Sequence, residues 1–575
     1  MKKALSILTA TLLLPIFVTG QGYLWVNQSI GEVGIGTADG RDVACDTEGN
    51  TYVVGNFKNT VYFGEFEVSG EFGTMYLAKY DPLGNPVWVR QINGNSNNKA
   101  HGIAVDNDQN IYICGEYKQT NELTILDFGS IQVTGNASPS TFIAKSDKDG
   151  NWQWVSTILS SDMIGNQYCI PDEILVNNEG HLFIAGKLNN AVTIEGSQYN
   201  TEYGNVAAFY FTRFKLNGEL SWFKSGRGIF TGIEYADTKV QRIVFAGRAD
   251  NTLKYNTDSI TGQGNGDVVF GAIDHEGNLS WWQTAGHPSY TEQPSGIAVD
   301  NDRNIYLAFN NFFWIKIGDL TIDYNGISDQ YLYKFDEQGE YLWTQPLYNG
   351  SVNGVNGIKS VDILTDPDGK AYVTGSFESP YYFGNPIFFT DTVGGYGYKE
   401  CFMAAYHANG SYADVSACIF DESYDNGEFI PSHLAFDHDL NITLVGKFRD
   451  NIMVDDVLLQ AGPVHQMFVY KVKPADLFDF SSSIFDQETE NINLSIHPNP
   501  FTSSTTIEYE LEKAETVTIS FYDQYGKLVE RMELQHAGDI QQMTWNAESL
   551  PAGIYFCELK TAHVVQSLKM IKLNN

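Results

Sequence analysis

The chain has 575 residues, a formal net charge of −35 at pH 7 and an aromatic content of 14%. Binding a nucleic acid requires a basic face, so this charge argues against a nucleic-acid partner, and it argues equally against an anionic membrane surface. No long apolar stripe with a period of 3.6 residues occurs, which predicts few helices. The length predicts a large core and a second, smaller domain.

Residues 1–20 have the pattern of a secretory signal peptide. Lys2 and Lys3 precede an apolar stretch, and small residues come directly before the expected cleavage between Gly20 and Gln21. The apolar stretch is too short for a retained transmembrane helix, and no cysteine follows the cleavage point to carry a lipid. We therefore expect export to the periplasm and no transmembrane segment.

Two apolar runs joined by an Asp/Asn/Gly turn recur along residues 21–475. The clearest copy begins at Asp106 and ends at Gly115, and the copies lie about 60 to 70 residues apart. Six turns begin at Asp46, Asp106, Asn177, Asp300, Asp366 and Asp437, and a worn seventh copy ends at Gly247. Apolar runs joined by such turns predict β-hairpins.

A second hairpin follows each copy, and in five copies it ends in a tryptophan: Trp88, Trp154, Trp222, Trp281 and Trp343. Two hairpins per repeat predict four antiparallel strands, the unit of a propeller blade, so we expect an all-β fold with a seven-bladed β-propeller. The seventh copy stops at Val472 without a tryptophan strand, whereas Trp25 lies in an early strand without a partner. The Trp25 strand should complete the last blade, and the tryptophans should pack between blades.

The repeats resemble the SBBP β-propeller repeat, on residues such as Asp46, Asn50, Tyr52 and Gly55 followed by Lys79 and Asp81. That family is defined mainly by its fold, so the resemblance implies an architecture and little chemistry.

Residues 476–490 have the composition of a polar linker. Beyond them, short strands expected near 505–510, 516–522, 543–545, 553–559 and 564–571 predict a small Ig-like β-sandwich over 491–575. An Ig-like module that binds a ligand by itself is one interpretation of this unit.

The same unit resembles the type A C-terminal sorting domain of the type IX secretion system. The motif residues are Pro498, Asn499, Pro500, Gly526, Gly553, Tyr555 and Lys569. The resemblance implies recognition by the type IX translocon and passage across the outer membrane. The protein would then be released, or attached to surface lipopolysaccharide.

No motif marks an active site. The sequence lacks HExxH, G-x-S-x-G, a phosphate-binding glycine loop and C-x-x-C. Turns such as that from Asp366 to Gly369 approach calcium loops, but a strand follows at once without a distal Glu, so turn chemistry explains them better. We assign no catalytic residue, no cofactor and no metal. Cys401 and Cys418 flank a predicted turn and could form a disulfide.

Function should lie where the blades differ. Trp314, Tyr381 and Tyr396 stand in segments unlike the other repeats and would suit stacking on sugar rings, although packing between blades would also explain them. We expect an extracellular or cell-surface protein with a non-catalytic binding, adhesion or scaffold role toward a glycan or a protein. The alternative is an extracellular polysaccharide hydrolase or lyase with its site at the propeller axis.

Overall fold

The computed structural model describes residues 23–573 except 33, 95, 97, 119–124, 136, 162–166, 201–206, 238–241, 265, 312–313, 324–328, 348–358, 378–380, 384–390, 394–399, 418–427, 455–456, 479–493, 512–515, 524–527, 536–538, 552 and 561–564. The chain divides into two compact units, whose main bodies adjoin in sequence between Phe478 and Asp479. The described residues include one short helix, α1 (Pro474–Leu477), and none that could span a membrane. Cys418 and the expected cleavage point lie outside them.

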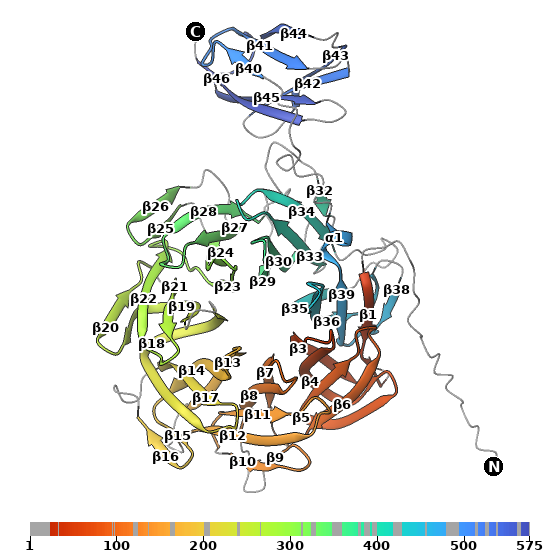
Figure 1. The fold of residues 1–575 in the computed structure, drawn as a ribbon, viewed down its shortest axis with the longest axis vertical. Coiled ribbons are helices and arrows are strands. Elements are labelled where there is room, and N and C mark those ends of the chain that lie inside the picture. The colour runs from red at the N-terminus through yellow and green to blue at the C-terminus, as the bar shows by residue number, and fades with distance from the viewer. Residues whose placement is uncertain are drawn as a thin grey trace, which may run out of the picture. The chain divides into compact units, whose positions relative to one another are not determined.

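The described residues of the first unit contain seven antiparallel paths of four strands, here called blades 1 to 7 (Figure 1). From the innermost strand outward, blade 1 consists of β3 (Thr37–Cys45), β4 (Thr51–Phe63), β5 (Phe66–Tyr80) and β6 (Pro86–Ile92), and blade 2 of β7 (Lys99–Val105), β8 (Ile111–Tyr117), β11 (Ser140–Ser146) and β12 (Trp152–Ser160). Blade 3 consists of β13 (Tyr168–Val176), β14 (His181–Asn189), β17 (Ala207–Lys215) and the first half of β18 (Leu220–Asp237). Blade 4 consists of the second half of β18, β19 (Arg242–Tyr255), β21 (Asp267–Asp274) and β22 (Leu279–Gly286). Blades 5 to 7 are β23 (Pro294–Val299), β24 (Ile305–Asn311), β27 (Asp329–Phe335), β28 (Tyr341–Pro346); β29 (Lys359–Thr365), β30 (Ala371–Phe377), β33 (Glu400–Tyr406), β34 (Tyr412–Ala417); and β35 (Glu428–Phe436), β36 (Ile442–Arg449), β39 (Gln466–Val472), β1 (Tyr23–Gln28).

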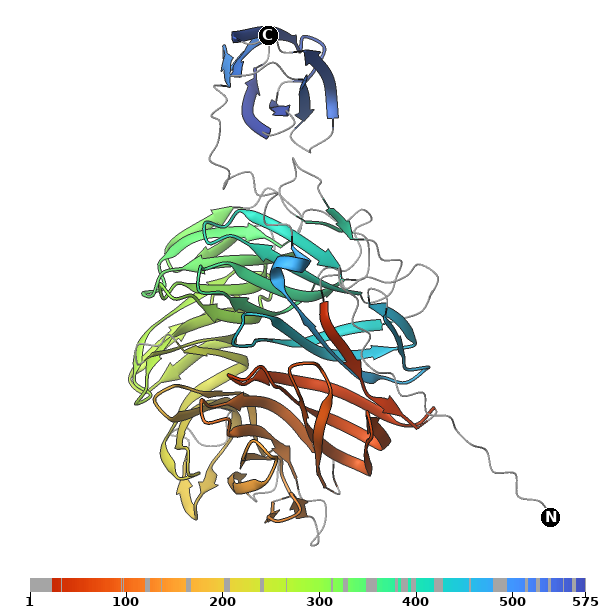
Figure 2. The same cartoon turned by 45° about the vertical axis from the view of Figure 1, so that its right-hand side comes forward.

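The innermost strands form a closed cycle. Each contacts the next, in the order β3, β7, β13, β18, β23, β29 and β35, and β35 contacts β3 again. The first strand of the described chain completes blade 7, because β1 pairs antiparallel with β39 and places Trp25 opposite Lys471. Figures 1 and 2 show β1, in red, beside β39, in blue. The predicted all-β propeller class is confirmed.

The first turn of most blades is held by its aspartate. In blade 1, Oδ1 of Asp46 accepts the backbone N–H groups of Glu48 and Asn50, both at 2.9 Å. Oδ2 of Asp46 accepts the Asn50 amide at 2.8 Å and the Tyr52 hydroxyl at 2.9 Å. Asp106 and Asp300 make the same contacts to Asn and Tyr side chains. The turn interpretation of these aspartates is confirmed.

A tryptophan links each of six blades to the next one. The indole N–H donates to a backbone carbonyl in the second turn of the neighbouring blade. The carbonyl belongs to the second residue of that turn. The pairs are Trp88 with Lys148, Trp154 with Leu216, Trp222 with His275, Trp281 with Glu337, Trp343 with Ala408, and Trp25 with Pro82, at 2.9–3.3 Å. Because Trp25 belongs to β1, the tryptophan that links blade 7 to blade 1 comes from the start of the propeller sequence. The prediction that these tryptophans pack between blades is confirmed.

Short additional strands join blades at their outer edges. The hairpin β15 (Val192–Ile194) and β16 (Ser197–Tyr199) pairs with β12 of blade 2, and β25 (Trp314–Ile317) with β26 (Leu320–Asp323) pairs with β22 of blade 4. The remaining short strands are β2 (Ile30–Gly31), β9 (Ile125–Asp127), β10 (Gln132–Thr134), β20 (Asp258–Thr261), β31 (Tyr381–Phe383), β32 (Asp391–Val393), β37 (Asn451–Val454) and β38 (Val457–Gln460).

The second unit contains two antiparallel sheets that share one core. The first sheet is β40 (Ser495–His497), β41 (Ser504–Leu511) and β44 (Asp539–Asn546); the second is β43 (Leu528–Gln535), β42 (Thr516–Asp523), β45 (Gly553–Lys560) and β46 (Val565–Lys572). Trp545 stacks on Phe521 at 4.2 Å between ring centroids and is buried with Ile507 and Cys557. All five predicted strands are present. The Ig-like topology and the domain boundaries stay predictions.

The sorting-motif residues lie mostly around β40, β45 and β46. Pro498, Asn499 and Pro500 are exposed, and Oδ1 of Asn499 accepts the backbone N–H of Ile571 at 2.8 Å. Tyr555 is buried and donates its hydroxyl to the Pro551 carbonyl at 2.8 Å. Gly553 begins β45, Lys569 lies in β46, and Gly526 is outside the described residues.

Candidate functional site

A cavity of about 420 Å³ lies where blades 7, 1 and 2 meet. Blade 1 contributes Arg41 and Lys58, blade 2 contributes Lys99, and blade 7 contributes Lys447 together with His465, which directly precedes β39. The volume falls within the usual range of small-molecule sites, about 300–1,000 Å³. A protein with a strong negative charge therefore has a pocket whose wall carries four lysine and arginine side chains.

Two of the four cations of this pocket are paired with carboxylates, and both Asp39 and Glu71 line the pocket. Asp39 accepts the backbone N–H of Asn56 at 2.9 Å and the Asn56 amide at 3.1 Å. It also pairs with Nη2 of Arg41 at 2.9 Å. Arg41 remains 46% exposed, and Lys99, which pairs with Glu116 at 2.7 Å, remains 43% exposed. Cations at a partly enclosed surface attract carboxylate groups more strongly than cations in open water.

The strand position of Arg41 explains why it projects into the pocket. β3 has a register shift between Gly40 and Asp42, so Arg41 is a bulge residue. A bulge redirects a side chain, and every innermost strand has a register shift of this kind. The repeat therefore supplies a bulge in each innermost strand, and in blade 1 the bulge residue carries a charge.

His433 links three blades beside the axis. Its Nδ1 lies 3.7 Å from Asp42 of blade 1 and 3.4 Å from Asp362 of blade 6. Burial by itself lowers the pKa of His433, but Asp42 and Asp362 outweigh burial and raise this pKa well above its usual range. Asp42 also accepts the backbone N–H of Ile103 at 2.7 Å, and Asp362 that of Leu434 at 2.8 Å. These contacts give the axial carboxylates a structural role.

Of the three aromatic residues predicted to contact glycans, the structure describes the side chain of Trp314 alone. Trp314 begins β25, is half-buried, and lies 4.4 Å from the His287 ring. Tyr381 begins β31, and Tyr396 lies outside the described residues. Glycan contact by these three residues stays a prediction.

A pair of fully buried carboxyl groups lies close to Trp314. Asp267 accepts the Gly264 N–H at 3.1 Å, and Glu292 accepts the His287 N–H at 3.2 Å. Burial, together with the neighbouring Asp267, raises the pKa of Glu292 to about 8. Oδ1 of Asp267 and Oε1 of Glu292 lack a donor, and one shared proton would satisfy both. Both side chains are fully buried and accept backbone N–H groups of nearby residues, so the pair has a structural role.

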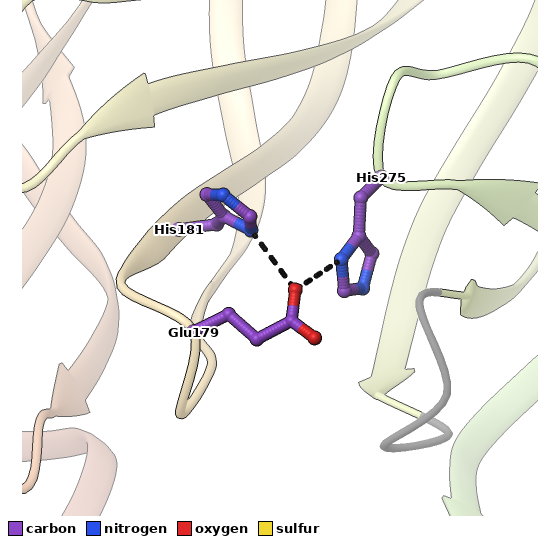
Figure 3. A group of neighbouring side chains, drawn as sticks. All are labelled: Glu179, His181 and His275. Atoms are coloured by element: carbon purple, nitrogen blue, oxygen red, sulfur yellow. Dashed lines mark hydrogen bonds and ion pairs between the residues drawn. The ribbon is translucent and has the colours of Figure 1, made fainter.

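Three residues that sequence reasoning missed meet between blades 3 and 4. Figure 3 shows the Glu179 carboxylate between the rings of His181 and His275. The two histidines belong to different repeats, so no short sequence motif contains both of them. The available signal was a departure from the repeat, since His181 stands where blade 1 has Asn50.

Comparison with known families finds a match in each of the two units. The model for a secretion system C-terminal sorting domain matches residues 495–573, and the model for the SBBP β-propeller repeat matches residues 87–116. The chain is therefore a β-propeller protein that carries a type IX C-terminal sorting domain. The sorting domain implies recognition by the type IX secretion machinery and export out of the cell.

Similarity to individual proteins is weaker. An uncharacterized WD repeat-containing protein of Acanthamoeba polyphaga mimivirus is 29% identical over 126 residues, which are 22% of this chain and 9% of that protein. A luciferin-regenerating enzyme is 9% identical with a TM-score of 0.31, over 65% of this chain and 91% of that one. A gluconolactonase from Xanthomonas campestris is 11% identical with a TM-score of 0.25, over 78% and 88% of the two chains. The fold assignment rests on the strand pairing and not on these likenesses.

Proposed function

We propose that the protein works outside the cell as a non-catalytic binding protein, and that its ligand carries carboxylate groups, as acidic polysaccharides do. The observation that carries this proposal is the pocket lined by Arg41, Lys58, Lys99 and Lys447. Charge-assisted hydrogen bonds from such side chains suit carboxylates. The net charge of −35 disfavours general attraction of anions, so binding would depend on this local site.

The export route belongs to the same proposal. A signal peptide cleaved between Gly20 and Gln21 takes the chain to the periplasm, and the sorting domain then takes it through the type IX translocon. The protein is released or attached to surface lipopolysaccharide. Fractionation of cells that express the chain with and without residues 491–575 tests this route, and retention of the full-length chain inside the cell would refute it.

The hydrolase or lyase alternative finds less support at the axis. An acid–base pair needs carboxyl groups that can exchange protons with a substrate. Asp42 and Asp362 instead accept backbone N–H groups from neighbouring strands and lie beside His433. Release of reducing ends from an acidic polysaccharide by the purified protein would favour the enzyme.

Binding is tested by calorimetry on the mature protein with oligogalacturonate and with its methyl ester, which has the same sugar backbone without the charge. Arg41→Ala and Lys447→Ala should each weaken binding of the acid about 10- to 100-fold, because a hydrogen bond to a charged group contributes about 1.5–3 kcal/mol. Lys215→Ala is the matched control, since Lys215 is 60% exposed and pairs with Glu219 in blade 3. Equal binding of acid and ester, or equal binding by all three variants, would contradict the proposed pocket.

A further inference from the structure

The junction of blades 3 and 4 departs from the turn chemistry of blades 1, 2, 5 and 6. In blade 1 the turn aspartate Asp46 accepts the Tyr52 hydroxyl. The corresponding residues in blade 3 are Asn177 and Phe183, and Phe183 has no hydroxyl to donate. His181 occupies the place of the asparagine of this turn. A histidine of the neighbouring blade, His275, faces it.

Hydrogen bonds anchor the two turns that carry Glu179, His181 and His275. Oδ1 of Asn177 accepts the backbone N–H of Glu179 at 3.1 Å and of His181 at 3.0 Å, which fixes the turn between β13 and β14. The His275 carbonyl accepts the indole N–H of Trp222 at 2.9 Å, which is the tryptophan link of this junction. The group therefore stands on two rigid turns and does not depend on a long loop.

The distances suit a metal ion. Oε2 of Glu179 lies 3.2 Å from Nδ1 of His275 and 3.7 Å from Nδ1 of His181 (Figure 3). One potential ligand atom from each residue lies within 4.8 Å of the others. Bond lengths of about 2.0–2.2 Å around a tetrahedral zinc ion place ligand atoms about 3.4 Å apart. The widest separation exceeds this spacing by at most about 1.4 Å, so a small movement of the side chains would bring the three atoms into one coordination sphere.

The surroundings of the ligand atoms also fit. Nδ1 of His181 is buried and makes no hydrogen bond to any described residue. A metal ion would supply the partner that this buried atom lacks. Asn177 lies 3.5 Å from Nε2 of His275 and provides an outer contact on the far side of that ring.

We propose that Glu179, His181 and His275 form a three-ligand site for a divalent transition metal ion of the zinc class, which clamps blade 3 to blade 4. Two imidazoles and one carboxylate favour zinc, cobalt or nickel over calcium and magnesium, which take mainly oxygen ligands. Glu179 is 48% exposed, so a fourth position can hold water from the solvent. The ion stabilises the ring because it binds the folded junction and not the separated turns.

Calorimetric titration of the chelator-treated, full-length mature protein with Zn²⁺ tests this site. We expect one ion per chain and a higher melting temperature with Zn²⁺, but not with Ca²⁺ or Mg²⁺. His181→Ala and His275→Ala should each weaken binding by more than about 100-fold, and Asn177→Ala by about 10- to 100-fold, the usual effect of losing an outer-shell partner. His438→Ala is the matched control, because His438 is an exposed histidine in the corresponding turn of blade 7.

A second readout does not depend on variants that fold. Co²⁺ bound to the wild-type site should give the visible absorption of a four-coordinate ion, and Zn²⁺ should remove it. The proposal is overturned if wild-type protein binds neither ion, or if both His181→Ala and His275→Ala bind Zn²⁺ as tightly as His438→Ala does.

Discussion

The Glu292 carboxyl shows how one buried group can make the stability of a blade depend on pH. Its pKa in the folded protein is about 8, above the ordinary value of a glutamate, because it is buried beside Asp267. Between about pH 4.5 and pH 8, the Glu292 carboxyl is therefore protonated in the folded state and ionised in the unfolded state. The stabilisation is complete below the unfolded pKa and is lost as the pH rises through the folded pKa.

Glu292→Gln should remove this pH dependence. We expect the unfolding free energy of the wild type to fall by at most about 1.4 kcal/mol for each unit between pH 5 and pH 8, because one proton is involved. The variant should change less over this range and should be the more stable protein at pH 9. Denaturant unfolding at pH 5, 7 and 9 measures this, and identical pH profiles for the two proteins would contradict the shared-proton account.

At the scale of elements, five of the six tryptophan links lie against the glycine that ends the neighbour's second turn. Gly218 has φ +89°, and a Cβ there would lie 2.8 Å from the Trp154 indole of the preceding blade. Gly84, Gly277, Gly339 and Gly410 meet tryptophans in the same way. The turn motif and the tryptophan are thus two halves of one contact between blades, which explains why they recur together in the sequence.

Gly218→Ala should destabilise the propeller more than Gly196→Ala. Both glycines have positive φ, so each alanine costs about 1–2 kcal/mol of backbone strain. Only Gly218 lies against an indole, whereas nothing lies within 4 Å of a Cβ at Gly196. Displacing Trp154 should add about 1–3 kcal/mol. Denaturation midpoints of the two variants make the comparison, and equal midpoints would show that the glycine contact does not matter.

Sequence reasoning predicted the elements that depend on patterns of neighbouring residues. Alternating apolar residues, turn aspartates and the D-x-x-G turns carry the strand positions, the blades and the links between them. The pocket could not be predicted, because Arg41, Lys99 and Lys447 come from three blades and only ring closure brings them together. The group around Glu179 is likewise a contact between two repeats. Of the aromatic residues that differ from the repeat in sequence, Trp314 has a described side chain, and it lies against the His287 ring.

At the scale of the whole propeller, ring closure places the pocket and the axial contacts. The outermost strand of blade 7 is β1 (Tyr23–Gln28), and Trp25 of this strand links blade 7 to blade 1. The pocket spans blades 7, 1 and 2, and His433 bridges blades 6, 7 and 1. Both features therefore lie at the point where the two ends of the propeller meet.

Hydrogen exchange on the mature protein tests this closure most directly. We predict that the backbone amides of β1 exchange as slowly as those of β39, because the two strands pair from Tyr23 to Gln28 and from Phe468 to Val472. In Trp25→Ala the protection of both strands should fall together. Fast exchange of residues 23–28 in the wild type, with β39 still protected, would show that β1 does not close the ring and would contradict the account.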